Sequence, residues 1–344
     1  MQLCTGCSSM MTMQASLHKT IESIWYGNSA SAWLLLPLAW LYGLIVAIRR
    51  SLYTSGFLAR PQLPVPVVIV GNITVGGTGK SPVVAWLAQQ LSSTGYTPGI
   101  VSRGYGGSHS GSALSVDANS DAAIVGDEPL MLAQMTGCPV CVCADRVAAV
   151  KAIAKQGVNV VIADDGLQHY RLRRTVELVV VDGQRGFGNK KLLPAGPLRE
   201  NLSRIRQADA LLVNGGAGLL DGIEFNLIPG DLISMDGSQT IALKDFYGLR
   251  VWGVAGIGNP ERFYSLLNNA GLEVDRVDVE DHGKYPLKSL IERRNQPILM
   301  TQKDAVKYRS SAPLNAWYLP VEVAFTDTDA TKLLQLIGKQ LAKG

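Results

Sequence analysis

The stretch VPVVIVGNITVGGTGKSP, residues 65–82, decides the fold class of this chain. Its first part is an apolar run rich in valine, which is typical of a strand buried on both faces of a parallel sheet. Its second part gathers three glycines, a lysine and a serine, and a helix is expected from Pro82 to Ser92. A glycine-rich turn between a strand and a helix is the structural context of a P-loop. The stretch therefore predicts an α/β nucleotide-binding fold.

The loop departs at one position from the usual G-x-x-x-x-G-K-[ST] pattern, because Thr74 stands where the first glycine is expected. Its remaining glycines still let backbone N–H groups approach phosphate oxygens without interference from a Cβ. We expect Lys80 to reach the β- and γ-phosphates and the hydroxyl of Ser81 to bind Mg²⁺. The predicted nucleotide-binding residues of the loop are Thr74, Val75, Gly76, Gly77, Thr78, Gly79, Lys80 and Ser81.

Short apolar runs that alternate with helical stretches continue to the end of the chain. Strands are predicted within residues 97–104, 138–143, 158–166, 176–183, 208–215, 250–258, 296–304 and 315–325. This alternation indicates an α/β protein with a largely parallel, covered sheet. Residues 215–237 are rich in glycine and turn formers, which makes them the best linker. We therefore predict a P-loop core domain over 61–215 and a smaller α/β domain over 216–344, with the boundary between 205 and 245.

Residues 30–48, ASAWLLLPLAWLYGLIVAI, carry no charged side chain and are followed by Arg49 and Arg50. As one helix they would rise about 28 Å, close to the thickness of a hydrocarbon core. A signal peptide would need a basic start and a cleavage site, and a buried core helix would be kinked at Pro37. A membrane-embedded helix explains the length, the flanking aromatic residues and the arginines.

We therefore predict a leader over residues 1–20 and a membrane-associated helix within 21–60, with the rest of the chain on the cytoplasmic side. The sequence leaves open whether the helix spans the bilayer or only dips into it. It also leaves the start open between Met1, Met11 and Met13.

The composition is that of a chain with a large core and few charges. Of 344 residues, 47% are hydrophobic and 17% charged, with a net charge of +4. This mild basic excess suits anionic substrates or an anionic membrane surface and is too small to indicate nucleic acid. Cys4 and Cys7 form one C-x-x-C pair and Cys138 and Cys141 another, far away and without a histidine cluster. Reduced thiols of a cytoplasmic protein are therefore favoured over a shared zinc site.

Acidic residues end one of the predicted strands and begin one predicted helix. Asp164 and Asp165 end the run 158–166, and carboxyl ends of parallel strands are where α/β proteins bind ligands. Beside a P-loop we expect Asp164 to hold Mg²⁺, although alone the pair would read as a turn cap. GDEP (126–129) places two acids at a helix start, where they could simply complement the helix dipole. In DHG (281–283) the imidazole of His282 fits a base, an orienting group or a surface histidine.

Basic residues offer partners for phosphate. LLPAGPLREN (192–201) is rigid and holds Arg199 at a fixed place, where its charge can neutralise a transferring phosphoryl group. RLRR (171–174), Arg103, Arg146 and Arg185 add cations that suit a phosphorylated substrate, or ordinary surface charges. TQKDAVK (301–307) is similar to loops that hold a nucleotide base through a lysine and an aspartate, here Lys303 and Asp304, and equally fits a solvated loop.

Together these motifs resemble those of one family. The combination of IWYGN, VGNITVGGTGKSP, GDEP, ADDGLQHYRL, DGQRGFGN, LLPAGPLRE and TQKDAVK resembles the tetraacyldisaccharide 4′-kinases of lipid A synthesis, from about Ile21 to the last strand. The resemblance implies an inner-membrane enzyme that transfers the γ-phosphate of ATP to the 4′-hydroxyl of a tetraacylated glucosamine disaccharide 1-phosphate. It also implies an α/β fold of two P-loop NTPase-like α/β/α domains with an N-terminal membrane-associated helix.

Residue by residue, the resemblance implies that Asp127 is the catalytic base and His282 its partner. Further matches to active-site positions are Glu128, Asp164, Asp165, Gln168, Arg199 and Glu200, with Arg146 a weaker one. The implied cofactors are ATP and Mg²⁺, and the implied partners are the acylated disaccharide 1-phosphate and the bacterial inner membrane, with no nucleic acid and no obligate protein partner. The family segment D-H-H reads Asp281-His282-Gly283 here, so the role of a second histidine is in doubt.

Two other functions fit part of the sequence. A membrane-recruited P-loop regulatory NTPase would need no lipid acceptor, but it leaves GPLRE and DHG unexplained. A membrane scaffold with a vestigial P-loop is disfavoured because Lys80, Ser81 and Asp164 are intact.

Overall fold

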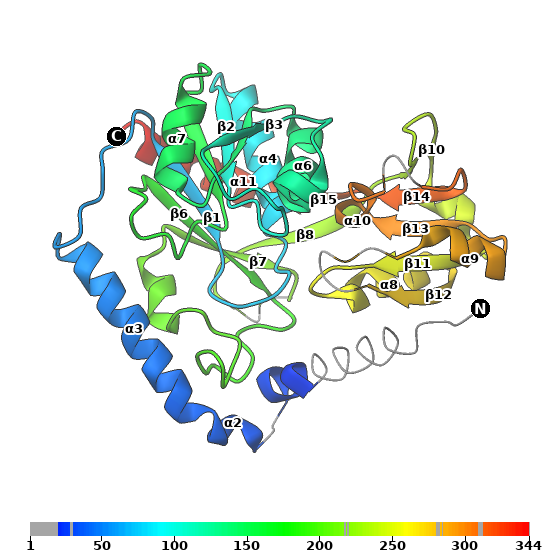
Figure 1. Ribbon diagram of the computed structural model, residues 1–344, viewed down its shortest axis with the longest axis horizontal. Helices are drawn as coiled ribbons and strands as arrows, with labels where there is room; N and C mark the ends of the chain where they lie inside the picture. The colour runs from blue at the N-terminus through cyan, green and yellow to red at the C-terminus, as the bar shows by residue number, and fades with distance from the viewer. Residues whose placement is uncertain are drawn as a thin grey trace.

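The computed structural model describes residues 20–27, 30–216, 218, 220–279, 283, 285–308 and 312–343. Within them, two β-sheets lie side by side, each with helices packed on it (Figure 1). The larger sheet has nine strands in the order β15-β8-β7-β6-β1-β5-β2-β4-β3, and the smaller has six in the order β10-β9-β14-β13-β11-β12. The prediction of an α/β protein with a largely parallel sheet is confirmed.

The element bounds are as follows. The larger sheet contains β1 (Val67–Gly71), β2 (Pro98–Ser102), β3 (Leu114–Val116), β4 (Val140–Val142), β5 (Val160–Asp164), β6 (Val176–Asp182), β7 (Ala210–Asn214), β8 (Ile223–Pro229) and β15 (Val321–Phe325). The smaller contains β9 (Leu232–Ser234), β10 (Thr240–Ile241), β11 (Arg250–Ala255), β12 (Glu273–Asp278), β13 (Ile298–Thr301) and β14 (Ala316–Leu319). The α-helices are α2 (Ser31–Leu34), α3 (Leu36–Thr54), α4 (Lys80–Ser93), α5 (Ala122–Val125), α6 (Asp127–Thr136), α7 (Arg146–Ala154), α8 (Pro260–Asn269), α9 (Leu287–Arg293), α10 (Gln302–Ala305) and α11 (Asp327–Leu341), and residues 20–26 are also helical.

The larger sheet is covered on both faces, which explains its continuous apolar strands. Along β1, Val68 and Val70 pack in one cluster with residues of α4, α6 and α11, whereas Val67 and Ile69 pack in another with α7. This alternation follows from the two-residue period of a strand. Since β5, β1, β6 and β7 are parallel neighbours, their carboxyl ends meet at one edge. The loops that follow these four strands therefore converge.

The chain passes from the larger sheet to the smaller one between Pro229 and Leu232, within the predicted range of 205–245. The predicted linker contains β8, which pairs with β7 of the larger sheet, and β9 of the smaller one. The predicted strand 315–325 is two strands, because β14 pairs with β13, Pro320 follows, and β15 pairs with β8. Helix α11 then packs on the larger sheet through Leu333 and Ile337. The chain thus leaves the larger sheet after β8 and returns to it at β15.

The apolar segment predicted as one helix over 30–48 is divided at Leu35 into α2 and α3. Pro37 lies in the first turn of α3, where its missing N–H has no helical partner to lose, and α3 continues to Thr54. Helix α3 runs along the outside of the molecule (Figure 1). Its solvent-exposed large side chains are Leu38, Trp40, Leu41, Leu44, Ile45 and Ile48. Among the described residues, no helix has both the length and the hydropathy needed to cross a bilayer.

Candidate functional site

The glycine-rich loop connects β1 to α4 at the convergent edge of the larger sheet. Gly76 and Gly79 have φ angles of 114° and 91°, which are left-handed conformations that favour glycine. Helix α4 begins at Lys80, so its positive dipole end faces the loop. Residues 230–320, which build the smaller sheet, are here called the smaller lobe, and the part of the chain around the larger sheet is the larger lobe. A Cβ on Gly258 of the smaller lobe would lie 2.6 Å from the nitrogen of Gly77, which shows how closely the loop after β11 approaches. The loop therefore lies at a helix N-terminus, a place where phosphate commonly binds in proteins.

Asp165 joins the loop lysine to the arginine of the GPLRE segment. Its carboxylate lies 3.7 Å from Nζ of Lys80 and accepts hydrogen bonds of 3.0 and 3.2 Å from Nη1 of Arg199. Burial raises the pKa of Asp165, but the charges of Lys80 and Arg199 outweigh it and hold that pKa below its usual value. Asp165 also has a φ of 49°, a strained conformation of the kind that clusters at functional sites. The structure thus brings three predicted site residues together.

Asp164, at the carboxyl end of β5, is a buried carboxylate. Neither of its oxygens has a hydrogen-bond partner among the described residues. Burial, followed by the charge of Glu128, raises the pKa of Asp164 to about 7. Mg²⁺ is commonly bound by one or two carboxylates together with substrate phosphates. Asp164 beside the phosphate loop fits that donor set, and Ser81 supplies a hydroxyl at the start of α4.

The structure shows no zinc-type cluster in the part of the chain that it describes. No group of three or more His, Cys, Asp or Glu side chains is arranged to hold a metal ion there. Cys138, Cys141 and Cys143 are free thiols, and Cys4 and Cys7 lie outside the described residues.

The GDEP acids begin α6 and face two lysines of the smaller lobe. Lys307 lies 3.6 Å from Asp127 and 2.8 Å from Asp304, and Nζ of Lys303 donates to Glu128 at 2.9 Å. Asp127 and Lys307 are both buried. The contacts join the N-terminus of α6 in the larger lobe to residues at and after α10 in the smaller one. The predicted base therefore lies where the two lobes meet.

Replacing Lys307 by methionine is expected to lower the free energy of unfolding by about 3–5 kcal/mol, because two buried carboxylates would lose their counter-charge. The side chain of Lys307 is only 1% exposed. Urea denaturation of both proteins measures the difference. Lys332→Met is the control, since Lys332 is 66% exposed and 3.8 Å from Asp329, and such pairs contribute about 1 kcal/mol or less. Equal losses in both variants would contradict a buried charge role for Lys307.

Other predicted residues have structural partners. Gln168 donates to the carbonyl of Asn72 at 2.8 Å, which supports the start of the glycine-rich loop. Buried Arg146 donates to the carbonyl of Cys143, and burial lowers its pKa while the charges of Asp164 and Asp165 act in the opposite direction. Gln168 thus supports the glycine-rich loop, and Arg146 lies near the carboxylate pair.

Glu200 and Asp304 are buried and engaged elsewhere. Glu200 accepts a 2.6 Å hydrogen bond from Tyr170, and burial raises its pKa. Asp304 accepts from the N–H of Gly256, the hydroxyl of Thr301 and Nζ of Lys307. Recognition of a nucleotide base by Lys303 and Asp304 stays a prediction, although the described contacts of Asp304 are all within its own lobe.

Two predicted residues lie outside the described part of the chain, and two residues of the site were not predicted from the sequence. Asp281 and His282 lie outside the described residues, so the Asp127–His282 pair stays a prediction. Sequence reasoning missed Lys307, although it belongs to the quoted TQKDAVK stretch. It also missed Asp182 at the end of β6, which lies 3.7 Å from Arg262 and 3.5 Å from the side-chain amide of Asn259, both from the smaller lobe.

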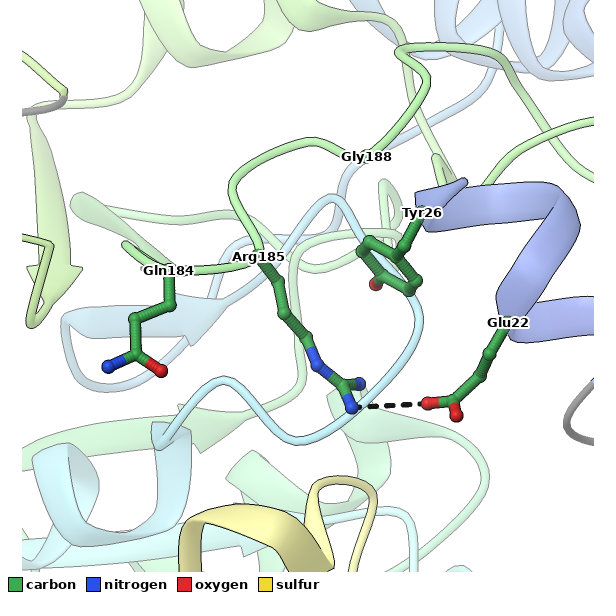
Figure 2. Close-up of a pocket in the computed structure, with 5 residues that line it drawn as sticks. All are labelled: Glu22, Tyr26, Gln184, Arg185 and Gly188. Carbon is green, nitrogen blue, oxygen red and sulfur yellow. Dashed lines mark ion pairs between the residues drawn. The ribbon is translucent and has the colours of Figure 1, made fainter. Parts of the chain in front are cut away.

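A cavity of ≈ 370 Å³ lies between residues 20–26 and the loop after β6. Glu22, Tyr26, Gln184, Arg185 and Gly188 line it (Figure 2). Arg185 pairs with Glu22 at 3.1 Å, lies 5.2 Å from the centre of the Tyr26 ring, and donates to the carbonyl of Gly258 at 3.2 Å. One guanidinium thus connects the N-terminal helical segment to both lobes next to the phosphate loop.

Comparison with known proteins shows the family to which this chain belongs. The family model of tetraacyldisaccharide-1-P 4′-kinase matches residues 31–341. The tetraacyldisaccharide 4′-kinase of Alkalilimnicola ehrlichii is 50% identical over 84% of this chain and 87% of its own, and that of Nitrosococcus oceani is 46% identical over 93% and 94%. The crystal structure of LpxK from Aquifex aeolicus in complex with ATP superposes with a TM-score of 0.76 at 29% identity, covering 90% of this chain and 99% of that one. A glycine-rich loop, an unpartnered buried carboxylate and an acidic helix start thus occur in a chain that belongs to the tetraacyldisaccharide 4′-kinase family, the LpxK kinases of lipid A biosynthesis.

Proposed function

We propose that this kinase transfers the γ-phosphate of ATP, with Mg²⁺, to the 4′-hydroxyl of a tetraacylated glucosamine disaccharide 1-phosphate. The observation that supports it most is the set of charges around the glycine-rich loop. Lys80 and Arg199 meet at Asp165, and in the part of the chain that the structure describes neither oxygen of the adjacent Asp164 has a hydrogen-bond partner. The Aquifex aeolicus relative was crystallised with ATP. We further propose that the larger lobe is the P-loop domain and the smaller a second α/β domain of related type.

Different residues have different roles in the proposed phosphoryl transfer. Backbone N–H groups of the loop and the ammonium of Lys80 bind the phosphates of ATP, and Arg199 offsets charge on the transferring group. When bound, Mg²⁺ neutralises phosphate charge, with Asp164 and Ser81 as its protein ligands. The carboxylate of Asp127 accepts the proton of the attacking 4′-hydroxyl, and His282 orients it. Glu128, held by Lys303, lies next to this base in sequence.

The test is direct. Purified full-length protein is incubated in detergent micelles with labelled ATP and the disaccharide 1-phosphate, and a bis-phosphorylated lipid is the expected product. ATP hydrolysis at the same rate with and without acceptor, and no labelled lipid, would overturn the proposal in favour of a regulatory NTPase.

We also propose that α3 lies on the cytoplasmic surface of the inner membrane, with its exposed apolar side chains in the interface. Arg49 and Arg50 follow these side chains and add positive charge at this end of the helix, which favours an anionic membrane surface. Leu41 and Ile45 are 56% and 57% exposed, although burying such side chains is favourable by about 1.5–3 kcal/mol each. The lipid acceptor would then be reached from the bilayer surface.

The double variant Leu41→Glu/Ile45→Glu is expected to lose at least about ten-fold in binding to vesicles that contain anionic phospholipid, because two apolar contacts become charged. Co-sedimentation with the vesicles measures this. Leu314→Glu is the matched control, since Leu314 is 96% exposed but lies outside α3. If the control and the double variant bind vesicles equally well, α3 is not the contact.

A further inference from the structure

Residues 191–199, here called the strap, are bound to the glycine-rich loop along one side. The N–H of Val75 donates to the carbonyl of Pro197 at 2.9 Å, and the N–H of Arg199 donates to the carbonyl of Ile73 at 2.6 Å. Thr74 and Leu198 form an isolated antiparallel bridge between these two contacts. The backbone of the strap and that of the phosphate loop therefore hold each other in register.

The N-terminal helices bind the strap from other positions. The indole N–H of Trp25 donates to the carbonyl of Pro194 at 3.0 Å, and the ammonium of Lys191 lies 4.3 Å from the centre of the Trp33 ring. Helix α3 contacts the strap at Gly43, where an added Cβ would lie 2.6 Å from a methyl of Leu192. The strap is thus in contact with both the phosphate loop and the apolar helices.

Tyr42 makes the contact that reaches the active site. Its hydroxyl donates to the main-chain carbonyl of Arg199 at 3.0 Å. Burial raises the pKa of Tyr42, against the charge of Arg199, so the hydroxyl keeps its proton. The same Arg199 uses its guanidinium to bind Asp165. On α3, Tyr42 is half-buried, whereas its neighbours Leu41 and Ile45 expose their apolar side chains to solvent.

We infer that Tyr42 is a positioning residue for Arg199, through which the seating of α3 sets the placement of the guanidinium at the phosphoryl group. This inference rests on the proposed function, because it assigns Arg199 to the transferring phosphate. A backbone shift of about 1 Å at a charge-stabilising group is enough to lower the rate considerably. Removing the hydroxyl of Tyr42 therefore affects the transition state more than the binding of ATP.

The experiment compares Tyr42→Phe with Tyr53→Phe in the full-length enzyme. Tyr53 is also half-buried on α3, and its ring lies 6.3 Å from that of Tyr170, but within the described residues its hydroxyl makes no hydrogen bond. Tyr42→Phe is expected to lower kcat roughly 3- to 10-fold with the KM for ATP unchanged, as loss of one hydrogen bond allows. Tyr53→Phe is expected to leave both values unchanged.

A double-mutant cycle separates positioning from a structural effect. In an Arg199→Ala background, Tyr42→Phe is expected to have no further effect on kcat, because the group it positions is gone. Three outcomes would each overturn the inference. The first is a kcat of Tyr42→Phe equal to that of the wild type, and the second is an equal loss of kcat in Tyr42→Phe and Tyr53→Phe. The third is a loss of kcat from Tyr42→Phe that is the same with and without the Arg199 guanidinium. If the wild type makes no phosphorylated lipid, the proposed function fails independently of this inference. The kcat of each variant relative to its background is then measured for ATP hydrolysis instead.

Discussion

Asp127→Asn is expected to lower kcat by about 10²- to 10⁴-fold, the range that general base catalysis contributes. The amide has the size of the carboxylate, whose oxygen lies 3.6 Å from Nζ of Lys307, but it cannot take the proton of the attacking hydroxyl. ATP binding is expected to change little, because Asp127 begins α6 and is not part of the phosphate loop. Steady-state kinetics with the lipid acceptor and a separate titration with ATP measure the two quantities.

Asp121→Asn is the matched control for this variant. Asp121 also stands at a helix start, where it caps α5 by accepting from the N–H of Ala123, and asparagine caps about as well. Its kcat should equal that of the wild type. A nearly normal kcat for Asp127→Asn would mean that another group removes the proton, and the assignment of the base would be wrong.

The parts of the fold that the sequence predicted are those whose signals are local. The strand, glycine turn and helix of residues 65–93 lie within one short stretch, so propensity and turn chemistry act together there. The carboxylates that end β5 were predictable for the same reason. The switch from β14 to β15 was not, because both halves of residues 315–325 read as strand and only pairing partners distinguish them. Pro320 was the one local signal of a break.

The unpredicted contacts of the site join residues distant in sequence. Lys307 of the smaller lobe contacts Asp127 of the larger one. Tyr42 contacts Arg199, from which it is separated by 157 residues in the sequence. No periodicity or spacing encodes such pairs, which depend on how the sheets and α3 pack. In the apolar N-terminal segment, summed hydropathy predicted one helix, whereas the backbone is divided at Leu35 with Pro37 starting the second helix.

Metal-free protein should show the cost of the unpartnered Asp164 as a pH dependence of stability. The folded-state pKa is raised to about 7, whereas an unfolded Asp titrates near about 3.9. Because the folded state binds this proton more tightly, the associated stability is fully present below about pH 4 and is lost as pH rises through about 7. Asp164→Asn removes that dependence. At pH 8 without Mg²⁺ the variant is expected to be more stable than the wild type by on the order of 4 kcal/mol in urea denaturation.

The same variant should lose activity while it gains stability. Without the Asp164 carboxylate the protein would bind Mg²⁺ through fewer ligands, and kcat is expected to fall at least about 100-fold because several kcal/mol of charge stabilisation depend on the metal. Mg-ATP should raise the thermal midpoint of the wild type strongly and that of Asp164→Asn only weakly, since ligand binding to the folded state sets the shift. The assignment of Asp164 to the metal site would be wrong if the wild type and the variant behaved alike in two measurements. These are the change in the free energy of unfolding between pH 4 and 8 and the shift of the thermal midpoint with Mg-ATP. Opposite effects on stability and rate would instead mean that this carboxylate is kept unpartnered at a thermodynamic cost because its open oxygens bind the metal.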